Sequence, residues 1–224
     1  MNPDPCSGHF LTAARAGHVP GLPGGQMSSV SVDMSMSLDG FVAGPNVGPA
    51  LPMGEGGELL HRWLFADPAD PYDAEVAAAQ RAAVGAVVLG RRTYDVGAPI
   101  WGDVPYPVPC FVLTHRPHDE LAMASGSFVF VTTGIHDAVE AARAVAGSRT
   151  VQVMGAQTVQ QVIAAGLLDE VQVNLVPVLL GHGVRMFDRL PADHLELERT
   201  KVIEGGSVTH LRFRVIDSHQ PAAD

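Results

Sequence analysis

The fold of this chain is decided by residues 151–170, Val151-Gln-Val-Met-Gly-Ala-Gln-Thr-Val-Gln-Gln-Val-Ile-Ala-Ala-Gly-Leu-Leu-Asp-Glu170. A short apolar run ends in a turn of small residues, and this turn opens an amphipathic helix that Gly166 ends. A second apolar run follows from Val171. A strand, a tight turn and a helix N-terminus together form a place where backbone N–H groups can hold a phosphate. The segment therefore indicates a nucleotide-type ligand.

The same kinds of pattern recur on both sides of this segment. Strands are predicted at 30–36, 85–90, 108–114, 127–132, 151–154 and 171–178, and helices at 58–65, 73–84, 137–146 and from 156 onward. The residues 200–204 and 207–215 predict an antiparallel hairpin across Gly205-Gly206. Strands that alternate with helices and end in a hairpin predict an α/β fold with a mixed sheet.

The composition is that of a compact globular protein. The chain has 224 residues, 46% of them hydrophobic and 17% charged, which is enough to bury a substantial core in one domain. Its formal net charge is −10, whereas a nucleic-acid-binding protein needs a basic surface, so we expect no nucleic-acid partner. No stretch has the pattern of a signal peptide or a membrane span, so we expect a cytoplasmic protein without a membrane partner.

The two ends of the chain differ from its middle. Residues 1–26 are rich in proline and glycine without periodicity, and predict a flexible tail or a start site placed upstream of Met27. We therefore place one domain at 27–217 and a second tail at 218–224. The stretch 44–57 predicts a long loop, which in a compact domain often carries function.

Three strand ends carry groups that suit a phosphate. Gly90 is followed by Arg91, Arg92 and Thr93, which place two guanidinium groups and a hydroxyl at a helix N-terminus. A second cationic stretch follows the strand that ends near 114, and it consists of Thr114, His115 and Arg116. A third stretch follows the strand at 151–154 and offers backbone donors: Gly155, Ala156, Gln157 and Thr158. Because ligands of open α/β sheets lie outside the carboxyl ends of the strands, the three stretches point to one shared site. Taken singly, each is equally consistent with a tight turn and solvated arginines.

The order and spacing of five motifs resemble those of the dihydrofolate-reductase-like family. The motifs are Ser37-Leu-Asp-Gly-Phe-Val-Ala-Gly, Val88-Leu-Gly-Arg-Arg-Thr-Tyr, the turn at Gly155, Gly166-Leu-Leu-Asp-Glu-Val and Pro177-Val-Leu-Leu-Gly-His-Gly-Val-Arg-Met-Phe. The resemblance covers about Met27 to Val215. It is greatest to the branch that contains the C-terminal reductase domain of the bifunctional riboflavin-biosynthesis proteins. It implies a mostly parallel central sheet flanked by helices, with a C-terminal antiparallel hairpin.

The resemblance also implies an NADPH site at the carboxyl edge of the sheet. Gly90, Arg91, Arg92 and Thr93 match the stretch that grips the adenosine phosphate and the pyrophosphate. The remaining matches are Thr114 and Arg116 beside the 2′-phosphate, Gly155, Ala156, Gln157 and Thr158 over the pyrophosphate, and Val42 and Ala43 beside the nicotinamide. The family usually has a second glycine where this chain has Ala156, so the approach of the cofactor to the backbone is in question there.

The substrate side has two candidate catalytic residues. Asp39 lies in the turn where relatives bind a substrate ring or ribose, but it equally suits a turn aspartate that binds its own backbone. Glu58 opens the helix that presents the proton-donating carboxylate in folate reductases, and it equally suits a helix N-terminal charge. The aromatic residues Phe41, Trp63 and Trp101 fit either a pocket wall or the core.

No metal site is expected. The histidines, including His61, His115, His182 and His210, have no metal-ligand spacing and are interpreted as surface or turn residues. Pro109-Cys110 has no second cysteine at the spacing that a zinc deaminase requires, so we expect a stand-alone reductase domain.

These observations predict an NADPH-dependent reductase of a small heterocyclic or ribosyl substrate. Its activity would be similar to that of 5-amino-6-(5-phosphoribosylamino)uracil reductase. The alternatives are a folate-type reductase, an NADP-binding protein without turnover, and a purely structural dimer module. The resemblance implies a homodimer, to which the apolar strand from Val171 to Leu180 is expected to contribute.

Overall fold

A computed structural model describes residues 28–101, 107–190 and 194–216. The predicted tails, 1–26 and 218–224, lie outside these residues. The strands are β1 Val30–Ser37, β2 Phe41–Ala43, β3 Val84–Gly90, β4 Cys110–Leu113, β5 Leu121–Ala122, β6 Ser127–Val131, β7 Thr150–Met154, β8 Glu170–Val176, β9 Val184–Arg185, β10 Leu197–Glu204 and β11 Thr209–Val215. The helices are the 3₁₀ helix η1 Gly57–Phe65, and α1 Pro71–Ala83, α2 Arg91–Trp101, α3 Ile135–Ala146 and α4 Ala156–Ala164.

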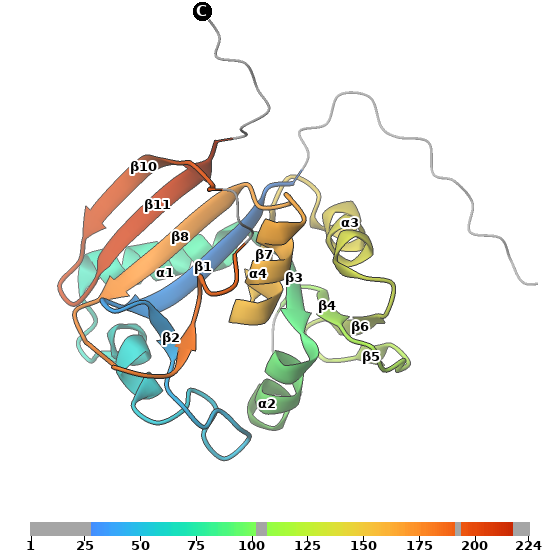
Figure 1. The fold of residues 1–224 in the computed structure, drawn as a ribbon, viewed down its shortest axis with the longest axis horizontal. Helices are drawn as coiled ribbons and strands as arrows, with labels where there is room; N and C mark the ends of the chain where they lie inside the picture. Colours follow the sequence, from blue (N-terminus) through green and yellow to red (C-terminus); the bar gives the residue numbers. More distant parts are fainter. Residues whose placement is uncertain (1–27, 102–106, 191–193, 217–224) are drawn as a thin grey trace, which may run out of the picture.

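The strands form one large sheet in the order β10-β11-β8-β1-β7-β3-β4-β6-β5, and β2 and β9 form a small second sheet. The six strands from β8 to β6 run parallel, whereas β11, β10 and β5 are antiparallel to their neighbours. The predicted fold class is therefore confirmed, including the C-terminal hairpin of β10 and β11. In Figure 1 the helices α3 and α4 lie in front of this sheet and α1 lies behind it.

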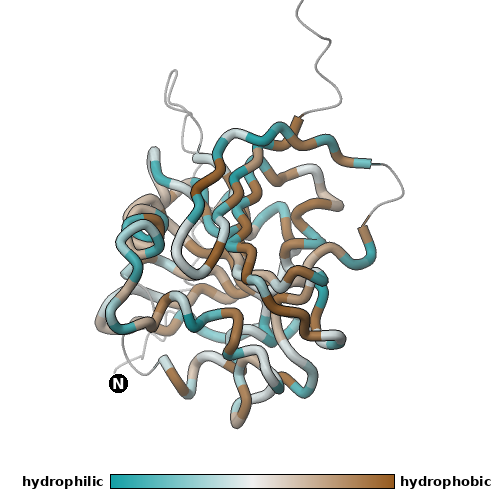
Figure 2. Tube along the Cα trace, turned by 90° about the vertical axis from the view of Figure 1, so that its left-hand side faces the viewer, coloured by the Kyte–Doolittle hydropathy of each residue, from teal (hydrophilic) through white to brown (hydrophobic). Residues whose placement is uncertain are grey.

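The main core lies on the α3 and α4 face of the sheet. Val30, Val32, Val151 and Val153 are fully buried there against apolar residues of both helices. The strands alternate in hydropathy, as Figure 2 shows through the middle of the molecule. The alternate residues of β1, β7, β8 and β11 therefore face α1, and many of them are polar.

The start of α1 is fixed by a side-chain cap. Asp70 accepts hydrogen bonds from the backbone N–H groups of Tyr72 (3.0 Å) and Asp73 (3.1 Å), and Pro71 occupies the first helical position, where its missing N–H costs nothing. The turn of the C-terminal hairpin packs closely against this cap. A Cβ atom built on Gly205 would lie 1.6 Å from Asp73 Oδ1, so only glycine fits at this contact.

Most predicted elements are confirmed, but three short strands were not predicted. The strands β2, β5 and β9 have two or three residues each, which is too short for a periodic pattern. The expected helix at 58–65 is a 3₁₀ helix. β8 pairs with β1 on one side and with β11 on the other, so it has no open edge for a second copy, and the expected interface at the strand from Val171 stays a prediction.

Candidate functional site

The three predicted phosphate-binding turns lie side by side. They follow β7, β3 and β4, which are adjacent parallel strands, so the turns meet at one edge of the sheet. A Cβ atom on Gly90 would lie 2.8 Å from Thr158 Oγ1, and one on Gly155 would lie 2.5 Å from Thr93 Oγ1. The first turns of α2 and α4 therefore face each other across these two glycines, and no larger residue fits at either position.

The N-terminus of α4 has backbone donors available. Gly155 precedes the helix with φ of 88° and provides no side-chain cap. Among the described residues, no acceptor contacts the N–H groups of Ala156 and Gln157. Free N–H groups at the positive end of a helix dipole form an anion site. The methyl group of Ala156 does not project into this site, because the residue is buried at 7% exposure within the main core.

The three arginines at this edge differ in whether their guanidinium groups already have hydrogen-bond partners. Arg91 Nε donates to Asp95 Oδ1 at 2.7 Å, and its guanidinium lies 5.7 Å from the centre of the Tyr94 ring. Arg92 Nη2 donates to the carbonyl of Val47 at 3.3 Å and so ties α2 to the long loop. The Arg116 guanidinium is exposed and has no partner in the described part of the chain. It is therefore the most available cation for a ligand phosphate.

Thr114 supports the position of Arg116. The Thr114 side chain is buried, and its Oγ1 accepts the backbone N–H of Arg116 at 3.1 Å. This short hydrogen-bonded turn directs the chain away from the end of β4. Of the two candidates predicted for the 2′-phosphate, Arg116 presents a charge to solvent, and Thr114 holds the turn beneath it.

Asp39 is engaged by the protein backbone. Its carboxylate accepts the N–H of Leu180 at 3.1 Å, the N–H of Gly181 at 2.7 Å and the hydroxyl of Ser37 at 2.6 Å. The Ser37 hydroxyl, together with these two N–H groups, lowers the pKa of Asp39 to about 2. Asp39 therefore joins the turn after β1 to the loop after β8, and as an ionised carboxylate it has no proton to donate at neutral pH.

The other candidates of the substrate side lie near this turn. Glu58 is exposed in the first turn of η1, and its carboxylate forms no hydrogen bond or ion pair with the other described residues. Val42 and Ala43 form β2, which pairs with β9. Trp63 is buried and donates its Nε1–H to Ser35 Oγ at 2.9 Å, so it belongs to the core.

Sequence reasoning did not find a polar network beneath α1. The interpretation of His210 as a surface or turn residue is wrong, because it is 3% exposed on β11. Its Nδ1 lies 2.7 Å from Asn174 Oδ1, and its Nε2 lies 3.1 Å from Asp73 Oδ1. Asn174 in turn donates to Asp33 Oδ1 at 2.9 Å and accepts from Gln80 at 3.3 Å. The available signal was the alternation of β1, which places Ser31, Asp33 and Ser35 on one face.

No metal site and no membrane span are found in the parts of the chain that the structure describes. No three His, Cys, Asp or Glu side chains there are arranged to hold a metal ion. His118-Asp119-Glu120 has the order of a deaminase motif but lies in an exposed loop after β4. None of the described helices is both long and apolar enough to cross a bilayer.

Comparison with solved structures shows the fold. The chain superposes with a TM-score of 0.65 on a protein from Shewanella sp. PV-4 described as a riboflavin biosynthesis protein, at 23% identity over 84% of this chain and 99% of that one. A pyrimidine reductase-like protein from Corynebacterium diphtheriae gives 0.57 at 12% identity, over 86% and 93%. The Thermotoga maritima deaminase and 5-amino-6-(5-phosphoribosylamino)uracil reductase gives 0.57 at 13% identity, and the match covers 57% of that longer chain.

Comparison of sequences shows the family. Residues 28–211 match the family model of the RibD C-terminal domain, which is most of the chain. A search of curated proteins gives no match. The matched range contains all the strand ends described above and every candidate site residue. The chain therefore belongs to the family of the RibD C-terminal domain, a family of riboflavin-pathway reductases with the dihydrofolate-reductase-like fold.

Proposed function

We propose that this protein is an NADPH-dependent reductase of a small heterocyclic or ribosyl substrate. The observation that carries the proposal is the contact of α2 with α4 at Gly90 and Gly155, together with two backbone N–H groups at the start of α4 that no acceptor among the described residues occupies. Such a cradle fits a pyrophosphate, because its donors are backbone groups and no side chain obstructs their approach. In this arrangement Arg91, Arg92 and Thr93 line one wall, and Ala156, Gln157 and Thr158 line the other.

The two ends of the cofactor follow from this position. Arg116 is placed to pair with a 2′-phosphate, and this pairing is the basis for a preference for NADPH over NADH. The nicotinamide end would lie near Val42 and Ala43. When bound, the cofactor supplies hydride, and the protein positions the acceptor and excludes water. We further propose that the enzyme works as a homodimer in the cytoplasm.

Titration with NADPH and with NADH, followed by nicotinamide fluorescence, tests this proposal. We expect NADPH to bind at least tenfold more tightly than NADH, and Arg116→Ala to abolish that preference while binding of NADH is kept. Arg81→Ala is the matched control, because Arg81 is an exposed arginine on α1, which lies on the other face of the sheet (Figure 1). Failure of the wild type to bind either dinucleotide at millimolar concentration would contradict the proposal.

The substrate is tested separately from the cofactor. The first compound to assay is 5-amino-6-(5-phosphoribosylamino)uracil, because the T. maritima relative is described as its reductase. Oxidation of NADPH that depends on this compound supports a riboflavin-pathway activity. Tight NADPH binding without any oxidation would instead support the alternative of a binding protein without turnover.

A further inference from the structure

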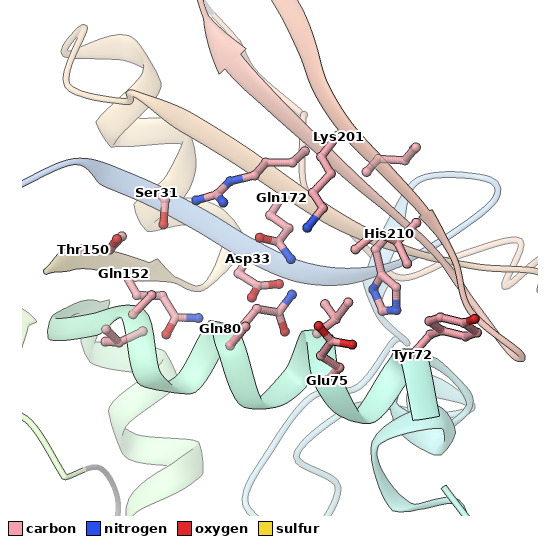
Figure 3. A pocket seen from close by; sticks show the side chains of 17 residues that line it. Ser31, Asp33, Tyr72, Glu75, Gln80, Thr150, Gln152, Gln172, Lys201 and His210 are labelled. Atoms are coloured by element: carbon pink, nitrogen blue, oxygen red, sulfur yellow. The ribbon is translucent and has the colours of Figure 1, made fainter. Parts of the chain in front are cut away.

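A cavity of about 400 Å³ lies between α1 and the sheet (Figure 3). Ser31, Thr150 and Val84 line it, and each is the first or second residue of its strand. The cradle of the proposed cofactor follows the opposite ends of β3 and β7, and no described residue of its turns lines the cavity. The helix α4 of the cradle also lies on the other face of the sheet (Figure 1). The cavity is therefore separate from the site proposed for hydride transfer.

The way in which α1 is anchored keeps this cavity open. Near the start of the helix, Asp73 Oδ1 lies 3.1 Å from His210 Nε2, and both side chains are buried. At its other end, α1 continues directly into β3 at Val84. Because both ends are attached to the sheet, the helix has little room to move toward it, and the small side chains of Val76 and Ala79 leave the space between them unfilled.

The floor of the cavity is a row of polar side chains from four adjacent strands. The register pairs Asp33 with Gln172, Gln172 with Arg212, and Arg212 with Lys201. All four residues line the cavity. Neighbouring strands lie ~4.8 Å apart, so the row extends over roughly 15 Å. A ligand on this floor can therefore contact several strands at once.

Several hydrogen-bonding groups of the floor are unused. The side chains of Gln152 and Gln172 form no hydrogen bond with any other residue that the structure describes. Asn174 donates to Asp33 Oδ1 at 2.9 Å, and Asp33 Oδ2 has no partner in the same part of the chain. A primary amide holds a donor and an acceptor side by side. The floor therefore suits a ligand that alternates donors and acceptors along one edge, and its combination with an apolar wall is typical of small-molecule sites.

The charges around the cavity favour a neutral ligand. Burial raises the pKa of Asp33 to about 7, so much of this carboxyl is uncharged at neutral pH. Arg212 is paired with Glu170 at 2.6 Å. At the rim, Lys201 and Glu75 are exposed side chains of opposite charge that reach the cavity from opposite sides (Figure 3). The cavity therefore presents little net charge to a ligand.

We propose that the cavity under α1 is a second ligand site, which binds a neutral planar heterocycle with an imide or lactam edge. The ring lies against the apolar side chains of α1, and its edge pairs with the amides of Gln152 and Gln172. A ligand held in this way bridges α1 and the sheet, so its binding stabilises the folded protein. The inference does not rest on the proposed reductase function, because no group of the cradle takes part in it.

Titration with lumichrome, followed by its fluorescence, tests this site. Lumichrome is a neutral planar ring system with one imide edge, and 3-methyllumichrome, which lacks the imide N–H, is the matched control ligand. We expect lumichrome to bind with a dissociation constant of ~100 µM or tighter, and 3-methyllumichrome to bind ~10-fold more weakly. Saturation with NADP⁺ should change the affinity for lumichrome by less than about twofold. Absence of saturable binding, equal binding of the two compounds or displacement by NADP⁺ would overturn the proposal.

Two variants locate the bound ring. Ala79→Leu fills the cavity and should abolish the binding of lumichrome, and Gln172→Leu removes one amide and should weaken it by ~10-fold. Ala78→Leu is the matched control for the first, because Ala78 is exposed on the same helix and does not line the cavity. Gln161→Leu, at an exposed glutamine of α4, is the control for the second. Wild-type affinity in both Ala79→Leu and Gln172→Leu would place the ligand elsewhere and refute the cavity site.

The side-chain amide resonances of ¹⁵N-labelled wild-type protein give a test in which the cavity is intact. The resonances of Gln152 and Gln172 are assigned by their loss in Gln152→Leu and Gln172→Leu. We expect both to shift when lumichrome is added, whereas the amide of Gln161 should not. Shifts confined to other side-chain amides, or none, would contradict the proposed pairing.

Discussion

The central strands present opposite chemistry to the two layers of helices. Toward α3 and α4 they present valines that are fully buried, such as Val32 and Val153. Toward α1 the neighbouring residues of the same strands are polar, such as Asp33 and Gln152, and they border a cavity. Because side chains alternate along a strand, one segment of chain serves both purposes. The difference indicates that the first face contributes more to the stability of the fold than the second.

The largest effect on stability is expected for two neighbouring substitutions in β7, one on each face of the sheet. Val153→Ala removes two methyl groups from a close-packed core and should lower the free energy of unfolding by about 3 kcal/mol. Gln152→Ala, at the next position of β7, lies at the edge of the cavity and should lower it by less than ~0.5 kcal/mol. Urea unfolding of both variants measures the two values.

Equal losses of unfolding free energy in the two variants would contradict this difference between the two faces. If Gln152→Ala costs as much as Val153→Ala, then the α1 face is part of the core and the cavity closes in solution.

A smaller effect is expected for Asp33 and depends on pH. The pKa of Asp33 is raised from 3.8 to about 7 in the folded protein, so the folded state binds more protons than the unfolded state between these values. Stability therefore falls as the pH rises through this window and stays reduced above about pH 7. Asp33→Asn removes this loss, and it should unfold with a free energy about 2 kcal/mol higher than the wild type at pH 8.

Urea unfolding at pH 4 is the internal control for this prediction. The protonated Asp33 carboxyl and an asparagine are nearly equal in size and both can accept from Asn174, so the variant and the wild type should differ by less than ~0.5 kcal/mol there. Equal stability at both pH values would show that Asp33 ionises as an exposed carboxylate does.

The sequence predicted the sheet and its carboxyl edge well, because both depend on local signals. Apolar runs such as 85–90 and small-residue turns such as Gly155-Ala156 have patterns of a few residues, and the parallel arrangement brings them together. The sequence predicted turns at Gly90 and Gly155. The contact between α2 and α4 at these glycines was found only in the structure.

The network beneath α1 could not be predicted in the same way. Asp73, Asn174 and His210 are separated by up to 137 residues, and each has ordinary neighbours in sequence. Only the register of β11 against β8 places His210 opposite Asn174. The same limit applies to Asp39, whose hydrogen bonds to Leu180 and Gly181, about 140 residues away, have no signal in the neighbouring sequence.

The smallest expected effect concerns Ala156, where the family usually has glycine. If its methyl group hindered the cofactor, Ala156→Gly should tighten NADPH binding tenfold or more. Because the methyl group is buried in the core on the α4 side, we expect the dissociation constant to change by less than ~3-fold.

We expect Ala156→Gly to change the stability of the fold more than it changes the affinity for NADPH. Loss of a buried methyl group and of helix propensity at the start of α4 should lower the free energy of unfolding by about 1 kcal/mol. Ala164→Gly, at the exposed end of the same helix, controls for propensity alone and should cost less. A clear gain in NADPH affinity for Ala156→Gly, without a loss of stability, would place the methyl group in the cradle and assign this position to the binding face.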